Sequence, residues 1–158
     1  MSEKQPLPEK QPLETPKGPV GLTDEEIAAE AAFMEGVPYL NIGALLMPPI
    51  WGPGHGQMIT ILFYPLWIFC DNVFYAAYST PSPLSIAVAI VVFITMALFT
   101  FVYGRLSQPR AWHRAHNMGK TKEQYLATER KWAIGMAVVA LVFLVLATWY
   151  NLFVKAGL

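Results

Sequence analysis

The sequence predicts an all-α membrane protein with three transmembrane helices and a short re-entrant or interfacial Pro/Gly segment. Two uncharged apolar runs, residues 84–104 and 132–154, each have about the 20 residues that a helix needs to cross roughly 30 Å of hydrocarbon. Hydrophobic residues make up 54% of the chain and charged residues 14%. A soluble domain carries about a quarter charged residues, so this composition favours a membrane protein.

Residues 1–36 form an acidic tail with three lysines against eight acidic residues. Residues 1–21 are rich in Pro, Glu, Lys and Gln, a composition that cannot bury enough apolar surface to fold, so we expect them to be disordered. This stretch contains no apolar run of the kind that a signal peptide requires, and we therefore expect no cleavable leader.

A short amphipathic helix is predicted over residues 23–35. Thr23 and Glu26 have the spacing of a capping box, in which each side chain hydrogen-bonds the other residue's backbone N–H. Gly36 and Pro38 then end the helix. Its apolar face is interpreted as a protein contact, because its opposite face is acidic and would be repelled by anionic headgroups. The residues on that contact face are Ile27, Ala31 and Met34.

Residues 37–158 are predicted to form the helical membrane domain, which opens with an irregular segment, 39–56. Its apolar part is too short to span a bilayer, and three prolines and four glycines prevent a continuous helix. Irregular backbone at membrane depth lines either a cavity or a protein contact. The segment is therefore either a re-entrant loop that gates a pathway or a stiff interfacial elbow leading into the first span, and the elbow is favoured.

The three predicted spans cover residues 57–78, 84–106 and 132–154. In the first, Pro65 is expected to introduce a kink. The second follows a tight Ser/Pro turn and the third a basic loop, 107–131. A second capping box at Thr121 predicts that a helix runs from Lys122 into the third span.

Orientation follows from the segment between Arg105 and Lys131, which holds seven basic residues against two acidic ones. The positive-inside rule places it in the cytoplasm of a bacterial inner-membrane protein, with the N-terminus inside and the C-terminus outside. A fourth crossing by residues 39–51 would instead move the tail outside. Since that rule already explains the basic charge, no nucleic-acid partner is expected. The side chains expected at lipid headgroups are Arg105, Arg110, Arg114 and Lys120.

Two groups of motifs resemble those of small bacterial multi-span inner-membrane proteins of uncharacterised function. The first is Asn41 to Gly52 followed by His55, where Ile42 replaces the Trp usual in the family. The second is the cytoplasmic pattern Ala111-Trp112, Glu123-Gln124-Tyr125 and Glu129-Arg130-Lys131-Trp132. The resemblance is distant, covers roughly residues 39 to 135, and implies a helical membrane domain with no activity assigned to any position.

Asp71 is the one acidic residue within a predicted span, and an intramembrane carboxylate is costly enough to suggest function. An interhelical contact with Asn151 or Lys155 is the favoured reading, and proton or cation handling is the alternative. The polar residues predicted inside the membrane are Asp71, Asn72 and Asn151.

No metal site or cofactor is predicted. The only candidate ligands are His55, His113 and His116, and the last two lie among basic side chains whose field disfavours a dication. No nucleophile elbow, Walker loop, zinc motif or dinucleotide fingerprint occurs, so we do not expect an enzyme.

The function predicted from sequence is that of an accessory or scaffold subunit in a larger membrane complex. Its partners would be membrane lipids and either other membrane subunits or further copies of the chain. Small residues at Ala133, Ala137 and Ala140 would let another helix approach closely. The alternative function is a component of an oligomeric ion or small-solute channel or transporter, with Asp71 and the elbow lining the path.

Overall fold

The computed structural model describes residue 21 and residues 23–155, and their regular structure is helical throughout. Residues 1–20, Leu22 and residues 156–158 lie outside the described part, and so does the predicted disorder of the tail. The chain divides into two compact units, residues 1–36 and 37–158, which are taken in turn.

The described helix of the first unit is α1, Asp24–Met34, and the predicted capping box opens it. Thr23 Oγ1 accepts from the backbone N–H of Glu26 at 3.2 Å, and the Glu26 carboxylate accepts from the backbone N–H of Thr23 at 2.8 Å. Gly36 follows with φ +77°, a left-handed conformation that ends the helix.

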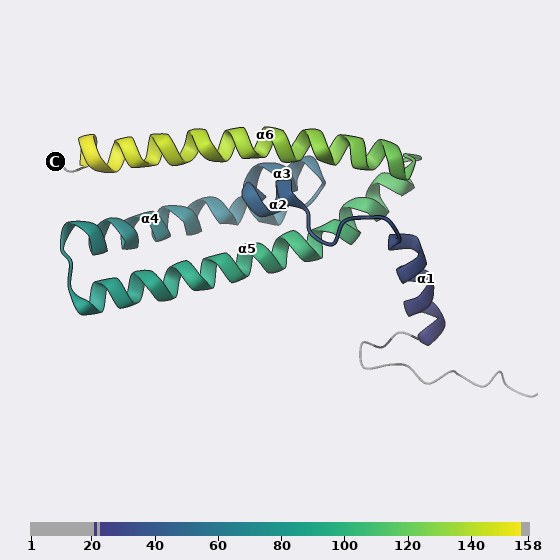
Figure 1. Ribbon diagram of the computed structural model, residues 1–158, viewed down its shortest axis with the longest axis horizontal. Helices are drawn as coiled ribbons and strands as arrows, with labels where there is room; N and C mark the ends of the chain where they lie inside the picture. Colours follow the sequence, from purple (N-terminus) through teal and green to yellow (C-terminus); the bar gives the residue numbers. More distant parts are fainter. Residues whose placement is uncertain (1–20, 22, 156–158) are drawn as a thin grey trace, which may run out of the picture. The chain divides into compact units, whose positions relative to one another are not determined.

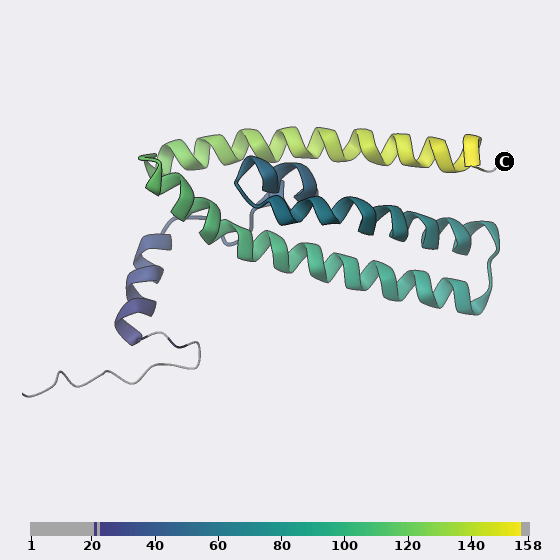
Figure 2. The same ribbon diagram turned by 180° about the vertical axis from the view of Figure 1, so that it is seen from behind.

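The second unit opens with two short helices, α2 (Ile42–Leu46) and α3 (Pro48–Gly54). Asn41 caps the start of α2, because its side-chain Oδ1 accepts a hydrogen bond from the backbone N–H of Ala44 at 2.9 Å. Two prolines occupy the first turn of α3, where a backbone N–H has no acceptor within the helix and its absence costs little. These two helices make up most of the irregular segment 39–56, which we call the elbow. Neither helix is long enough to cross a bilayer. Helix α2 packs against two of the long helices that follow, α5 (Pro83–Asn117) and α6 (Lys122–Trp149), as Figures 1 and 2 show.

The first predicted span begins as a 3₁₀ turn, η1 (Met58–Leu62), and continues as α4 (Phe63–Ser79). Pro65 therefore lies in the first turn of α4, where its missing N–H breaks no helical hydrogen bond. The helix type changes from 3₁₀ to α two residues before Pro65, and α4 then continues without a break through Asp71 and Asn72. The expected kink stays a prediction.

Two long helices complete the unit: α5 (Pro83–Asn117), and α6 (Lys122–Trp149), which continues as a π-helical turn, η2 (Tyr150–Val154). The capping box at Thr121 is confirmed, with the N–H of Gln124 donating to Thr121 Oγ1 at 3.3 Å. The basic connection 107–131 is mostly helical, because α5 extends to Asn117, α6 begins at Lys122 as expected, and only residues 118–121 separate them. At about 1.5 Å per residue, α5 is roughly 50 Å long and extends well beyond the hydrocarbon.

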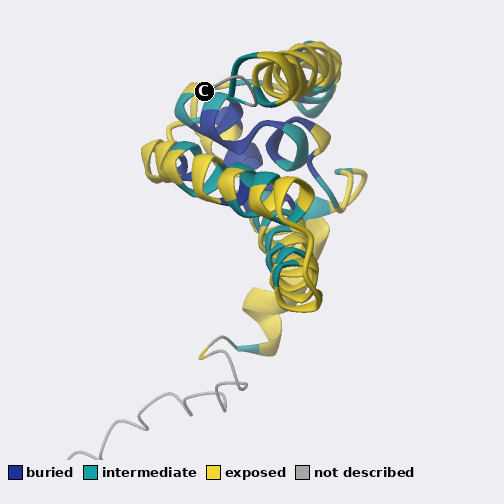
Figure 3. Cartoon of the chain, turned by 90° about the vertical axis from the view of Figure 1, so that its left-hand side faces the viewer, coloured by how far each residue is buried: buried dark blue, intermediate teal, exposed yellow. Residues whose placement is uncertain are grey.

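Three helices are long and apolar enough to cross a membrane, namely Met58–Ser79, Pro83–Asn117 and Lys122–Val154. They bury little against one another: no residue is buried in the most apolar stretch of α5. Figure 3 shows the buried residues gathered between the long helices, whose outward turns are exposed. The core lies instead around the elbow and the basic ends of α5 and α6, and it includes Trp51, Met47, Trp112 and Tyr125.

Candidate functional site

Acidic residues are scarce in the second unit, where residues 37–158 contain only Asp71, Glu123 and Glu129. Glu123 is exposed on the first turn of α6. The other two carboxylates make contacts between segments far apart in the sequence, and Glu129 is the centre of the largest polar network that the structure shows.

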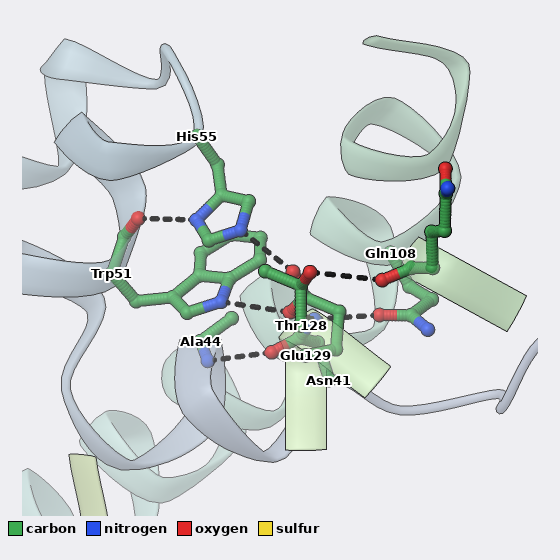
Figure 4. A network of polar contacts seen from close by, with 8 residues as sticks. Asn41, Ala44, Trp51, His55, Gln108, Thr128 and Glu129 are labelled. Carbon is green, nitrogen blue, oxygen red and sulfur yellow. Dashed lines mark hydrogen bonds and ion pairs between the residues drawn. The ribbon is translucent and has the colours of Figure 1, made fainter. Parts of the chain in front are cut away.

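Glu129, on α6, receives hydrogen bonds from the elbow on both carboxylate oxygens (Figure 4). Its Oε2 accepts from Asn41 Nδ2 at 2.7 Å and from Trp51 Nε1 at 3.0 Å. Its Oε1 lies 2.7 Å from His55 Nε2. A carboxylate that accepts this many N–H groups is favoured in its ionised form, which only accepts hydrogen bonds.

Asn41 connects the elbow to α5 as well as to α6. Besides Glu129, its Nδ2 donates to Gln108 Oε1 at 2.7 Å, while its backbone N–H donates to the carbonyl of Gly104 at 3.0 Å. A side chain on Gly104 would have its Cβ 3.4 Å from the Asn41 carbonyl and 3.1 Å from the Leu40 side chain, so the glycine permits this close approach. Asn41 and Gln108 are 3% and 2% exposed, so their amide groups are paired away from water.

His55 is held by both of its ring nitrogens and by two indole rings. Nδ1 lies 2.8 Å from the carbonyl of Trp51, and the imidazole stacks on the Trp51 ring at 3.9 Å with the planes 12° apart. The ring of Trp132 meets it edge to face at 5.2 Å. Both ring nitrogens therefore face an oxygen, Nδ1 the Trp51 carbonyl and Nε2 the Glu129 carboxylate.

We call the group of five side chains joined by these contacts the polar network; its members are His55, Glu129, Asn41, Trp51 and Gln108. Its histidine and glutamate side chains are each 11% exposed, and Trp51 is fully buried. The network joins the elbow, α5 and α6 by donors and acceptors that satisfy one another. Chemically, it can fix the elbow in place against α5 and α6.

Asp71 makes the interhelical contact that the sequence favoured. Asn151 Nδ2, in the π-helical turn η2 that continues α6, donates to Asp71 Oδ1 at 2.7 Å. One turn away, Lys155 Nζ donates to Asn72 Oδ1 at 2.7 Å and lies 4.3 Å from the centre of the Tyr75 ring. These contacts join α4 to the C-terminal end of α6.

The three histidines considered as metal ligands are not assembled into a site. Within residues 21 and 23–155, no group of three His, Cys, Asp or Glu side chains is placed to hold a metal ion. His55 is bonded to Glu129, whereas His113 and His116 are exposed on the last turns of α5.

The basic side chains assigned to lipid headgroups occupy different surroundings. The Arg105 guanidinium lies 3.7 Å above the Tyr39 ring. Arg114 fills the space where a side chain on Gly56 would be, and Arg110 lines an apolar groove on the outside of the unit. Lys120 lies in the turn before α6. Whether they contact lipid stays a prediction.

The predicted partner-contact face of α1 is accessible within its own unit. No residue of α1 is buried, and Ile27 is 42% exposed. Ala31 is exposed and Met34 is half-buried. Their contact with a partner stays a prediction.

The polar network was missed at the level of sequence. Asn41, His55 and Glu129 all occur in the motifs that carry the family resemblance, yet nothing in their spacing of 74 to 88 residues indicates that they meet. One available signal was the scarcity of acids in residues 37–158, since a lone carboxylate beside a span usually has a buried partner.

Neither a protein-family model, nor a curated protein, nor a solved structure matches the chain. The resemblance to small bacterial inner-membrane proteins therefore stays a prediction.

Proposed function

We propose that this protein is an accessory or scaffold subunit of a membrane complex and acts by association rather than catalysis. One observation carries the proposal: few residues of the membrane helices are buried, while the elbow beside them is fixed by the polar network. A rigid end with largely uncovered helices suits a subunit that docks along its spans.

The surface of α6 supports this proposal. Ala133, Ala137 and Ala140 place small side chains along one side of the helix, and Ala137 is exposed. Small residues allow two helix backbones to approach closely, which supplies the packing that drives association in lipid. We propose that another membrane subunit, or a second copy of this chain, lies against this stripe.

The first experiment is gentle detergent extraction of the native protein, with native-gel sizing and mass spectrometry of what migrates with it. The decisive comparison is Ala137→Leu against Val138→Leu, because both positions are exposed and neither change disturbs the core. We expect Ala137→Leu to shift the protein to smaller species and Val138→Leu to leave the complex intact. A monomer without companions in the native extract contradicts the proposal.

Transport is the second candidate, because Asp71 places a carboxylate within a membrane helix. Asp71→Asn separates the two functions: its amide oxygen can still accept from Asn151, whereas it cannot bind a proton or cation as a carboxylate does. Intact assembly with loss of ion or solute flux in proteoliposomes would favour transport. Unchanged flux and assembly would leave Asp71 a structural role.

We further propose the bacterial inner membrane as the location, with the basic ends of α5 and α6 in the cytoplasm. The seven basic residues between Arg105 and Lys131 support this orientation through the positive-inside rule.

A further inference from the structure

An apolar groove of about 580 Å³ runs between the start of the first membrane helix and the C-terminal half of α5. On one side it is lined by Ile59 and Leu62, and on the other by Leu98, Phe99, Val102 and Leu106. All six side chains are at least 49% exposed, so they form an outward surface and not part of the core.

The polar atoms of the residues that line this groove are buried, except at one end of the groove. Thr60 is 2% exposed and its hydroxyl donates to the carbonyl of Gln57 at 2.8 Å. The hydroxyl of Tyr103 is buried. The walls therefore suit a hydrocarbon chain and offer little to a polar solute.

Arg110 closes the groove at its basic end. It follows Leu106 by one helical turn on α5, and Arg114 follows by one more turn, where its guanidinium lies against Gly56. None of the three acidic residues in 37–158 lines the groove. The site thus combines an apolar channel within the predicted span with positive charge just beyond its end.

We propose that this groove binds one phospholipid with an anionic headgroup, with an acyl chain along Phe99 and Val102 and the phosphate at Arg110. The apolar walls lie within the predicted span and Arg110 lies just beyond its end. The acyl chains and headgroup of a lipid have this same order in the leaflet on the basic side of the membrane. Basic residues at the ends of grooves between membrane helices recognise anionic headgroups by charge, and the guanidinium can bind two phosphate oxygens at once. The inference does not depend on the accessory function.

The test is native mass spectrometry of the full chain, purified in detergent and incubated with dioleoyl phosphatidylglycerol or with dioleoyl phosphatidylcholine. We expect tighter binding of the anionic lipid, weakening as salt is raised. Arg110→Gln should lower phosphatidylglycerol affinity about tenfold, whereas Lys131→Gln, which removes the same charge from α6, should not. Equal losses in the two variants would show diffuse charge attraction and overturn the proposal.

A second variant tests the acyl-chain part of the site. Val102→Trp fills the groove without changing charge, and because Val102 is 49% exposed the core should stay intact, as thermal unfolding would verify. We expect it to lower binding of the intact lipid at least as much as Arg110→Gln does. Unchanged binding would overturn the assignment. Displacement by glycerol phosphate alone would also overturn it, because it would mean that Arg110 binds free phosphate without the chain.

Discussion

Glu129 is the residue on which the packing of the elbow depends most. Its two oxygens accept from Asn41, Trp51 and His55, which come from the elbow, while Glu129 itself belongs to α6. All four side chains are buried or nearly so. Removing the acceptor would leave several donors without partners in a place that water barely reaches, and that is costlier than the net value of the bonds.

Glu129→Gln is therefore expected to lower the free energy of unfolding by about 3 kcal/mol. The amide keeps the shape of the side chain but turns one acceptor into a donor, which faces either the His55 ring or the indole N–H of Trp51. The measurement is thermal or denaturant unfolding in detergent, with Glu123→Gln as the matched change at an exposed glutamate of the same helix. Similar stability of the two variants would contradict the assigned role of Glu129.

Sequence reasoning identified some of these residues without their partners. For Asp71, an interhelical contact with Asn151 or Lys155 was favoured because all three lie on the same proposed side of the membrane, and Asn151 is the residue that it contacts. Glu129 is followed directly by Arg130 and Lys131, and an acidic residue in such a charged stretch is expected to be exposed to solvent. Its burial arises from the elbow folding back between α5 and α6, a long-range arrangement that local spacing does not encode.

At the scale of elements, the elbow depends on glycines that allow helices to touch. A Cβ added to Gly52 on α3 would overlap the side chain of Thr60 on η1, which is itself 2% exposed. Neither group has room to move away. By contrast, nothing lies within 4 Å of a Cβ added to Gly135, which is in the interior of α6.

The same substitution is thus expected to have opposite effects at two helical glycines. Gly52→Ala should destabilise the protein by about 1–3 kcal/mol through overpacking. Gly135→Ala should stabilise it by up to about 1 kcal/mol, because alanine loses less backbone entropy in a helix. Both are measured by unfolding in the same detergent, and a neutral Gly52→Ala would show that α3 and η1 can separate without cost.

The caps of the helices were predictable, whereas the extent of α5 was not. Thr23 and Thr121 begin helices where the capping pattern indicated, because capping is a local interaction. The basic residues after Arg105, together with Pro109, read as a loop. They form helix because Ala111, Trp112 and Ala115 bury one face and the Trp112 ring packs 5.2 Å from that of Tyr125.

At the scale of the whole second unit, polar contacts hold the helices together where apolar packing does not. The network around Glu129 joins the elbow to the basic ends of α5 and α6, and the Asp71–Asn151 contact joins α4 to the other end of α6. Between these points the spans leave their apolar faces uncovered, so that either lipid or a partner helix can lie against them. Fold class and span number were predictable because they depend on composition and length, which are properties of the sequence alone.

This arrangement predicts that the turn before α5 and the turn before α6 lie on opposite sides of the membrane. With Cys70 replaced by alanine, Ser82→Cys and Gly119→Cys each provide a single thiol in an exposed turn. In intact cells, a membrane-impermeant maleimide should label Ser82→Cys readily and Gly119→Cys only after permeabilisation, because the positive-inside rule places the second turn, with seven basic residues around it, in the cytoplasm. The reverse pattern would invert the orientation, and labelling of both in intact cells would mean that α5 does not cross.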